Sequence, residues 1–219
     1  MEITITKEEK ALYTVLAFIS AGTGDNAFFD DFKESVLIEK GQEYPDRVFI
    51  ISSNGVRMHC AAIYDGAVKA ICPGLLEHET WDCKVRAGKA VLSSREVAYK
   101  KWRCVVPEQV IAGAMPTGYD LLGKDYAING KELSSISYAL AKAGICINHA
   151  FLQDMTKPFG KIEADVFQER NKPEGRVLFK HKGYSMGMDI RLLCLCAVIM
   201  PMRTQYVSLL SRTETAESE

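Results

Sequence analysis

The chain has 219 residues, of which 47% are hydrophobic and 25% charged, and its net charge is −1. These values are ordinary for a globular protein of one domain or two small lobes. The seven cysteines are irregularly spaced, which favours reduced thiols over a disulfide framework, and no apolar run approaches the ~20 residues of a membrane-spanning helix. We therefore expect a cytoplasmic location and no membrane partner.

The first forty residues predict two helices. Thr6 and Glu9 have the spacing of a capping box, and apolar residues recur after them at helical intervals. Asn26 can cap a second helix that continues through Leu37. This part of the chain is acidic, because residues 1–46 hold ten Asp or Glu against four Lys or Arg.

A change of pattern near residue 48 predicts β-structure. Residues 48–51, 56–60 and 67–71 are short and rich in β-formers. The pairs Asn54-Gly55 and Asp65-Gly66 separate them and supply the positive φ angles of type I′ turns. We predict a three-stranded antiparallel meander.

Beyond Ser94 the pattern favours helices again. Ser94 can cap a helix over residues 95–104, and Pro107 suits the first turn of a short one. Residues 132–143 predict a helix that Gly144 ends.

The remaining segments predict mostly helix. A further helix is expected to run through Asp154, and residues 176–182 suit a strand. Residues 188–200 are almost entirely apolar, which predicts a buried helix.

The predicted fold is α+β and mainly helical, with N-terminal helices, the three-stranded meander and a helical C-terminal lobe. The connector Met115-Pro116-Thr117-Gly118 marks the expected boundary. The predicted units are residues 1–115, an N-terminal lobe with the meander, residues 116–212, a helical C-terminal lobe, and residues 213–219, a disordered tail.

Positive charge is concentrated in two windows. Residues 84–103 hold seven basic residues and one acidic residue, and residues 172–191 hold five and two. Lys and Arg neutralise phosphates, and aromatic rings among them can stack on unpaired bases. The alternative is that the charges lie on separate solvated surfaces and the aromatics in the core. The candidate nucleic-acid-binding residues are Lys84, Arg86, Lys89, Arg95, Tyr99, Lys100, Lys101, Trp102, Arg103, Arg176, Lys180, Lys182 and Arg191.

Catalytic and metal-binding patterns are weak. Cys146 and His149 are three residues apart on a predicted helix, which permits a thiol–imidazole pair or, alternatively, a buried Cys and a hydrogen-bonded His. Cys194 and Cys196 are too close for a CxxC pair, and the four histidines are isolated from one another. We expect no metal and no cofactor.

The stretch Leu133 to Ala141, with sequence LSSISYALA, is followed by Gly144 and Cys146. It resembles the central helix of nucleocapsid proteins from segmented negative-strand RNA viruses of the phlebovirus and bunyavirus type, with the pattern Leu-Ser-x-(Val/Ile)-x-x-Ala-Leu-Ala. Flexible filamentous plant virus coat proteins are similar in architecture. The β-meander departs from the all-helical phlebovirus type. The resemblance implies two lobes around a basic cleft that holds RNA, and terminal arms that dock on neighbouring copies.

The first functional hypothesis is a non-catalytic structural protein that binds single-stranded RNA and self-associates into a homo-oligomer or filament. It would be a viral nucleocapsid or coat protein of the host cytoplasm and virion. The alternatives are a small cytosolic enzyme that uses Cys146 and His149, and an α+β protein–protein interaction module with one acidic and one basic face.

Overall fold

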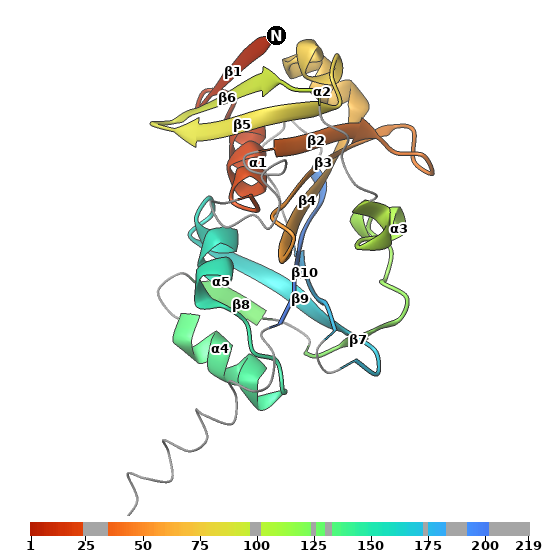
Figure 1. The fold of residues 1–219 in the computed structure, drawn as a ribbon, viewed down its shortest axis with the longest axis vertical. Helices are drawn as coiled ribbons and strands as arrows, with labels where there is room; N and C mark the ends of the chain where they lie inside the picture. Colours follow the sequence, from red (N-terminus) through yellow and green to blue (C-terminus); the bar gives the residue numbers. More distant parts are fainter. Residues whose placement is uncertain are drawn as a thin grey trace, which may run out of the picture.

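The computed structural model describes residues 1–23, 35–96, 102–123, 126–129, 133–172, 175–182 and 192–201. Within these ranges, eleven strands form one antiparallel sheet (Figure 1) in the order β1-β6-β5-β2-β3-β4-β11-β10-β9-β7, with β8 also paired to β9. The strands are β1 (Glu2–Thr6), β2 (Ser35–Lys40), β3 (Arg47–Ser53), β4 (Arg57–Tyr64), β5 (Thr80–Arg86), β6 (Lys89–Ser94), β7 (Tyr119–Leu121), β8 (Tyr126–Asn129), β9 (Lys161–Glu169), β10 (Val177–His181) and β11 (Leu192–Ile199).

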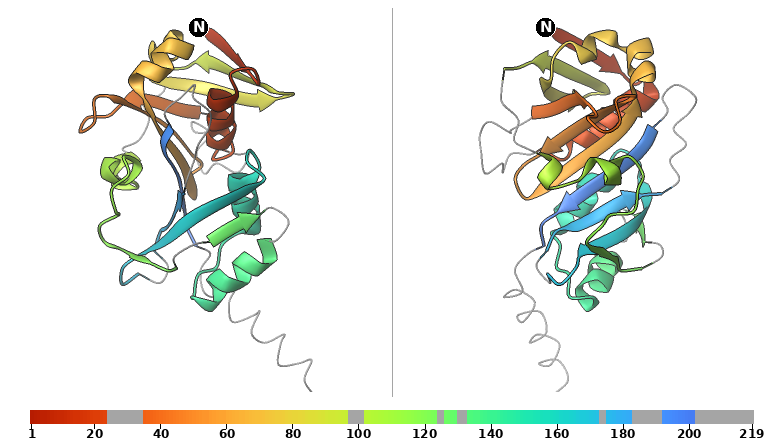
Figure 2. Two further views of the ribbon diagram at one scale, coloured as in Figure 1. Left: turned by 180° about the vertical axis from the view of Figure 1, so that it is seen from behind. Right: turned by 90° about the vertical axis from the view of Figure 1, so that its right-hand side faces the viewer.

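Short helices cover both faces of the sheet. They are α1 (Lys10–Ser20), α2 (Asp65–Ile71), α3 (Glu108–Ile111), α4 (Leu133–Lys142) and α5 (His149–Thr156), with 3₁₀ turns η2 (Pro73–Leu76) and η3 (Trp102–Cys104). Figures 1 and 2 show α1, α4 and α5 on one side of the sheet and α3 on the other.

The same order of elements occurs twice along the chain. A strand, a helix and three antiparallel strands follow one another as β1-α1-β2-β3-β4, and again as β8-α4-α5-β9-β10-β11 with two helices. The last strands of the two units, β4 and β11, pair with each other at the centre of the sheet. The hairpin β5–β6 lies between β1 and β2, so it extends the sheet only in the first unit.

Two hydrophobic cores lie on the two faces of the sheet. Leu16 of α1, Trp81 of β5 and Leu140 of α4 belong to the larger core, and Trp102 of η3 and Ile111 of α3 belong to the smaller one. The central strands are therefore buried on both sides, which requires apolar residues at consecutive positions.

Only half of the predicted capping box forms, because the Thr6 hydroxyl accepts the backbone N–H of Glu8 at 3.2 Å and not that of Glu9, and the N-cap of the helix is Glu9. The backbone N–H of Thr6 donates to the Glu9 carboxylate at 2.9 Å, and the Thr6 hydroxyl donates to it at 2.6 Å. Helix α1 starts at the next residue and buries Leu12, Leu16 and Ile19 against the sheet.

The predicted meander exists, but one of its three predicted strands is wrong. The turn at Asn54-Gly55 does join β3 to β4, with Gly55 at φ 90°. The third strand was expected at residues 67–71, but α2 occupies them. The strand that completes the meander is β2, in a segment where a helix was predicted. Its side chains alternate between the two cores, which gives a continuous apolar run that resembles a helix face.

The apolar segment near the C-terminal end is also a strand and not the predicted helix. Leu195, Ala197 and Ile199 of β11 enter the larger core, whereas Cys196 and Val198 enter the smaller one. A run that is buried on alternate sides has no polar face, so composition alone does not separate a central strand from a buried helix.

The chain is therefore built mainly on antiparallel sheet, and the prediction of a mainly helical protein is wrong. Helices α4 and α5 and strand β10 were predicted, but β7, β8, β9 and β11 make the second half far richer in sheet than expected. The boundary near residue 115 stays a prediction. No helix in the described ranges is long and apolar enough to cross a membrane.

Candidate functional site

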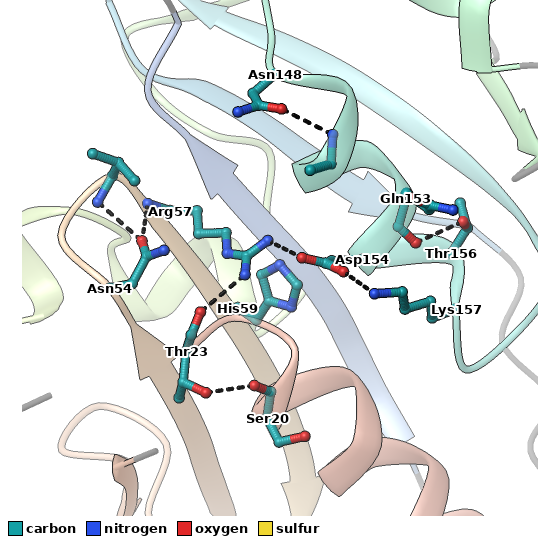
Figure 3. A network of polar contacts seen from close by, with 12 residues as sticks. Ser20, Thr23, Asn54, Arg57, His59, Asn148, Gln153, Asp154, Thr156 and Lys157 are labelled. Atoms are coloured by element: carbon teal, nitrogen blue, oxygen red, sulfur yellow. Dashed lines mark hydrogen bonds and ion pairs between the residues drawn. The ribbon is translucent and has the colours of Figure 1, made fainter. Parts of the chain in front are cut away.

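A polar network joins α1, β4 and α5 (Figure 3). The Arg57 guanidinium on β4 forms an ion pair with Asp154 on α5. It also donates to the Thr23 carbonyl, just beyond α1, at 2.9 Å and lies 4.6 Å from the centre of the Phe151 ring. Lys157 binds the other carboxylate oxygen of Asp154 at 2.6 Å. These contacts connect the first and second units of the fold.

The charge of Asp154 is stabilised by its two cationic neighbours. Burial alone would raise the pKa of this carboxyl group, but hydrogen bonds from Lys157 and Arg57 outweigh burial and hold its pKa below the ordinary value. Asp154 is therefore ionised at neutral pH and has no proton to donate.

Two buried histidines lie beside this network. The ring of His59 stacks on Phe18 at 4.6 Å, and its Nδ1 donates to the Phe18 carbonyl at 2.7 Å. His181 meets the same Phe18 ring edge-on at 5.2 Å. Burial lowers the pKa of His59 to about 4, and burial together with the charge of His59 lowers the pKa of His181 to about 3. Both rings are neutral at pH 7 and act as packed aromatic side chains.

A surface pocket of about 430 Å³ lies along the outer side of α1, and we name it the α1 pocket. Side chains of α1 between Tyr13 and Ala21 form one wall. Lys7 and Val85 line it beside the start of the helix, and Lys157 and Pro158 line it beside the end of the helix. The pocket therefore draws residues from both units of the fold, and the Arg57 network supports the side on which Lys157 lies.

The lining of the α1 pocket mixes apolar, hydroxyl and cationic groups. It combines apolar surface from Ala17, Val85 and Pro158 with hydroxyl groups, and both charged residues in its described lining are lysines. The described lining contains no carboxylate, imidazole or thiol. Such a lining can hold an apolar side chain that has a negative charge close to it.

Of the predicted basic residues, three lie exposed on the β5–β6 hairpin. Lys84 and Arg86 are on one face of β5, and Lys89 of β6 is directly opposite Arg86 in the strand register. Arg95, just after β6, instead forms an ion pair with Asp82 at 3.0 Å.

Trp102 and Arg103, at the end of the first basic window, make contacts within the protein. Trp102 is buried against Phe49, and its indole N–H donates to the carboxylate of Glu39. Arg103 forms ion pairs with Glu39 at 2.7 Å and with Glu108 at 2.5 Å. These two side chains hold η3 and α3 against the sheet.

The second basic window also makes internal contacts. Arg176 donates to the carbonyl of Cys104 at 2.8 Å, and Lys180 donates to the carbonyl of Gly113 at 2.9 Å. Lys182 forms an ion pair with Asp165 at 2.8 Å. Strand β10, which carries Lys180, is separated from β5 by β2, β3, β4 and β11, so this window is far from the exposed hairpin in the sheet order. Tyr99, Lys100, Lys101 and Arg191 lie outside the described residues, and nucleic-acid binding at these positions stays a prediction.

The structure does not bring Cys146 and His149 together as a reactive pair. Cys146 is buried after the end of α4, whereas His149 is exposed at the first residue of α5, and no hydrogen bond joins them. All seven cysteines are free. Within the described ranges, no three His, Cys, Asp or Glu side chains converge on a point that could hold a metal ion.

Sequence reasoning missed the α1 pocket and the network beside it. A usable signal was the outer side of α1, where Thr14, Ala17, Ser20 and Ala21 replace the charged residues usual on a solvated helix face. Arg57 and His59 were a second signal, since they alternate within a strand whose other residues are apolar.

No protein-family model matches the sequence, and no curated protein matches it. Among solved structures, the DNA polymerase III beta subunit of Thermotoga maritima aligns over 93% of this chain and 65% of its own, with 11% identity and a TM-score of 0.47. The Pseudomonas aeruginosa DNA polymerase sliding clamp aligns over 93% and 67%, with 9% identity and a TM-score of 0.45. The Helicobacter pylori beta clamp bound to a DNA ligase peptide aligns over 92% and 65%, with 9% identity and a TM-score of 0.46.

The chain thus spans about two thirds of the length of the clamps it resembles. Identities and scores at this level assign neither family nor function. They do correct the resemblance drawn from residues 133–146, because the similar structures are sliding clamps and not viral nucleocapsid or coat proteins. A single antiparallel sheet also replaces the two helical lobes that an RNA cleft required. The prediction of a viral protein that packages single-stranded RNA is wrong.

Proposed function

We propose that the chain is a non-catalytic protein–protein interaction module that binds a segment of a partner protein in the α1 pocket. The observation that supports this function is the pocket itself, which lies beside α1, draws residues from both units of the fold and has a mixed apolar and hydroxyl lining. Concave sites with apolar walls and a few polar groups are typical of ligand binding. The volume of about 430 Å³ suits one or two side chains of a peptide.

The elements that form the pocket are held by packing and by an ion pair, which favours binding. Helix α1 packs six buried side chains against the sheet, and the Arg57–Asp154 ion pair fixes α5 relative to β4. A preorganised site loses less conformational entropy when its partner binds. One of the resembling clamps was solved with a DNA ligase peptide. For this chain, we propose a peptide ligand because of the volume and the lining of the α1 pocket.

A peptide library displayed on phage tests the function. Peptides selected on the wild-type chain should bind it in a fluorescence polarisation assay, and Ala17→Arg should weaken binding by about tenfold or more because its side chain fills the pocket. Arg preserves the helix, because its helix propensity is close to that of Ala.

The matched control is Ala143→Arg, at an exposed position just after α4 and outside the pocket lining. It should leave peptide affinity unchanged. If every selected peptide bound wild type and Ala17→Arg equally well, the α1 pocket would not be the binding site and the proposal would fall.

Self-association is a second part of the proposal. Strand β1 pairs with β6 on one side and with no described strand on the other, so its free edge can accept a strand from a second copy. Light scattering after size-exclusion chromatography measures the mass directly, and a monomer at high protein concentration would contradict self-association. A cytoplasmic location is also proposed, since seven free thiols suit a reducing compartment.

A further inference from the structure

Strand β1 forms one edge of the described sheet, and its backbone groups alternate between β6 and this edge. The backbone N–H of Ser94 donates to the carbonyl of Met1 at 2.9 Å, so Met1 bonds to β6. Bonded positions alternate along an antiparallel pair, and the register of β1 with β6 has no irregularity. The odd-numbered residues of β1 therefore bond to β6, and the even-numbered residues, Glu2, Thr4 and Thr6, direct their N–H and C=O groups to the edge.

A carboxylate closes one end of this edge. The Glu9 carboxylate accepts the backbone N–H of Thr6 at 2.9 Å and the Thr6 hydroxyl at 2.6 Å. A strand that paired along Thr6 would meet this negative charge in place of a free donor. Glu2 and Thr4 are exposed, and their edge-directed backbone groups form no hydrogen bond within the described part of the chain. The open part of the edge therefore consists of two residues that lie symmetrically about Ile3.

The edge at β1 lacks the features that usually prevent strands from pairing. Proteins protect exposed edges with proline, lysine, inward-pointing charges or a β-bulge. Residues 2–6 contain none of these, because Ile3 and Ile5 point to the larger core and the pairing with β6 is regular. At the other end of the sheet, β7 and β8 each cover only part of β9, and Asp120 of β7 pairs with Arg170 at 2.9 Å. Of the two ends, the edge at β1 is therefore the one suited to pairing.

We propose that two copies of the chain join through β1, in antiparallel pairing about a two-fold axis at Ile3. This inference rests on the proposed function, since it names the surface and the register of the proposed self-association. Glu2 of each copy is opposite Thr4 of the other, so both edge residues exchange their N–H and C=O groups across the axis. Ile3 is opposite Ile3 of the second copy on the inner face, which buries apolar surface.

The position of the Glu9 carboxylate determines this register. An axis at Thr4 would place Glu2 of one copy opposite Thr6 of the other, beside the carboxylate that already occupies the Thr6 N–H. The two negative charges would repel, and one carbonyl in each copy would lose its donor. With the axis at Ile3, no like charges are opposite each other, and a second copy satisfies every open group of the edge. Because this axis is perpendicular to the sheet, helix α1 of each copy lies on the same face of the combined sheet.

Thr4→Pro tests the surface, because it removes the edge-directed N–H and leaves the bonds to β6 intact. Sedimentation over a series of protein concentrations should show a reversible dimer of the wild type. Its dissociation constant should rise about tenfold or more in Thr4→Pro, since each dimer loses two hydrogen bonds and gains two unpaired carbonyls. The matched control is Thr4→Val, which keeps the N–H and should dimerise as the wild type does. Circular dichroism checks that both variants are folded.

Disulfide trapping tests the register and does not depend on the proline variant. Both variants carry Cys104→Ser, which removes the exposed native thiol. Ile3→Cys should form a covalent dimer when diamide oxidises the two thiols, because opposite residues of a non-hydrogen-bonded pair have Cα atoms about 4.5 Å apart. Thr4→Cys should form none, because its two copies are diagonal neighbours about 7–8 Å apart.

The possible outcomes separate this inference from the proposed function. A covalent dimer of Thr4→Cys without one of Ile3→Cys would overturn the register. A wild-type dimer that Thr4→Pro does not weaken and Ile3→Cys does not trap would overturn β1 as the surface and leave self-association standing. A wild-type monomer at every concentration would overturn both the surface and self-association. Peptide binding in the α1 pocket would be judged separately, by its sensitivity to Ala17→Arg.

Discussion

Arg57 on β4 and Asp154 on α5 form an ion pair, although 97 residues separate them in the sequence. Only 6% of the Arg57 side chain and 17% of the Asp154 side chain are exposed. The contact therefore links the two units of the fold in a place from which water is largely excluded.

Replacing Arg57 by Met should lower the free energy of unfolding by about 3 kcal/mol, because Asp154 would keep its charge in a half-buried position with only Lys157 beside it. Urea denaturation followed by circular dichroism measures this change. The control is Lys161→Met, which removes an exposed ion pair with Glu163 and should leave stability unchanged. Equal stabilities of the two variants would show that the Arg57–Asp154 pair does not stabilise the fold.

The close packing of α1 on β4 predicts opposite effects at two glycines. A Cβ atom on Gly22 would lie 2.7 Å from Cγ of His59, so Gly22→Ala should lower the free energy of unfolding by about 2 kcal/mol. A Cβ atom on Gly66, inside α2, would meet nothing within 4 Å. Gly66→Ala should therefore raise stability by about 0.5–1 kcal/mol, since Ala favours helix. Chemical denaturation of both variants checks the prediction, and stabilisation by Gly22→Ala would contradict the tight packing.

The buried histidines predict a loss of stability in mild acid. An unfolded histidine has a pKa of 6.5, whereas the folded values are about 4 for His59 and about 3 for His181. The unfolded chain therefore binds more protons than the folded chain below pH 6.5, and the free energy of unfolding falls as the pH decreases from there to the folded pKa values. Each histidine contributes a slope of up to about 1.4 kcal/mol per pH unit.

Urea unfolding at a series of pH values tests this prediction. His59→Asn should flatten the dependence between pH 6.5 and about 4, whereas His149→Gln, at an exposed position, should preserve it. Asp154 adds a further loss of stability at lower pH. Its pKa is lower in the folded chain than in the unfolded chain, so protonation removes the stabilisation that its charge provides. An unchanged slope in His59→Asn would exclude His59 as a source of the acid sensitivity.

Charge reversal should separate structural cations from exposed ones. Burial would raise the pKa of Glu108, but hydrogen bonds from Arg103 and from the backbone N–H groups of Glu43 and Gln42 outweigh burial and keep its pKa low. Arg103→Glu would place a third carboxylate beside Glu39 and Glu108 and should lower the free energy of unfolding by about 2 kcal/mol or more. Arg86→Glu removes a repulsion at an exposed tip and should not destabilise the chain. Thermal unfolding of the two variants distinguishes these outcomes, and a stable Arg103→Glu variant would contradict the internal role of Arg103.

Local signals in the sequence predicted individual elements well. The Thr6 and Glu9 spacing predicted the presence of α1 but placed its N-cap three residues too early. Asn54-Gly55 located the β3–β4 turn, and Gly144 located the end of α4. Each of these signals acts within a few residues, so no knowledge of the tertiary fold was needed. The central strands β2 and β11 were not predicted, because residues buried on both faces lack the alternation that identifies a strand.

The candidate site could not be predicted from local sequence signals, for a different reason. The α1 pocket combines residues near positions 7–21, 85 and 157–158, which only the paired strands bring together. The basic window was visible as a count of charges, but the count did not separate Arg86, which is exposed, from Arg103, which pairs with Glu39 and Glu108. That difference depends on where each carboxylate lies in the folded chain.

Strand β11 is the last described strand in the chain, yet it lies in the middle of the sheet between β4 and β10. During synthesis, β4 therefore cannot pair with β11 until residue 199 has left the ribosome. About 130 residues are made between these two strands. In that interval, the apolar edge of β4 is a target for mispairing with other nascent chains. Chaperone binding to ribosome-stalled chains should therefore decrease sharply once β11 has emerged.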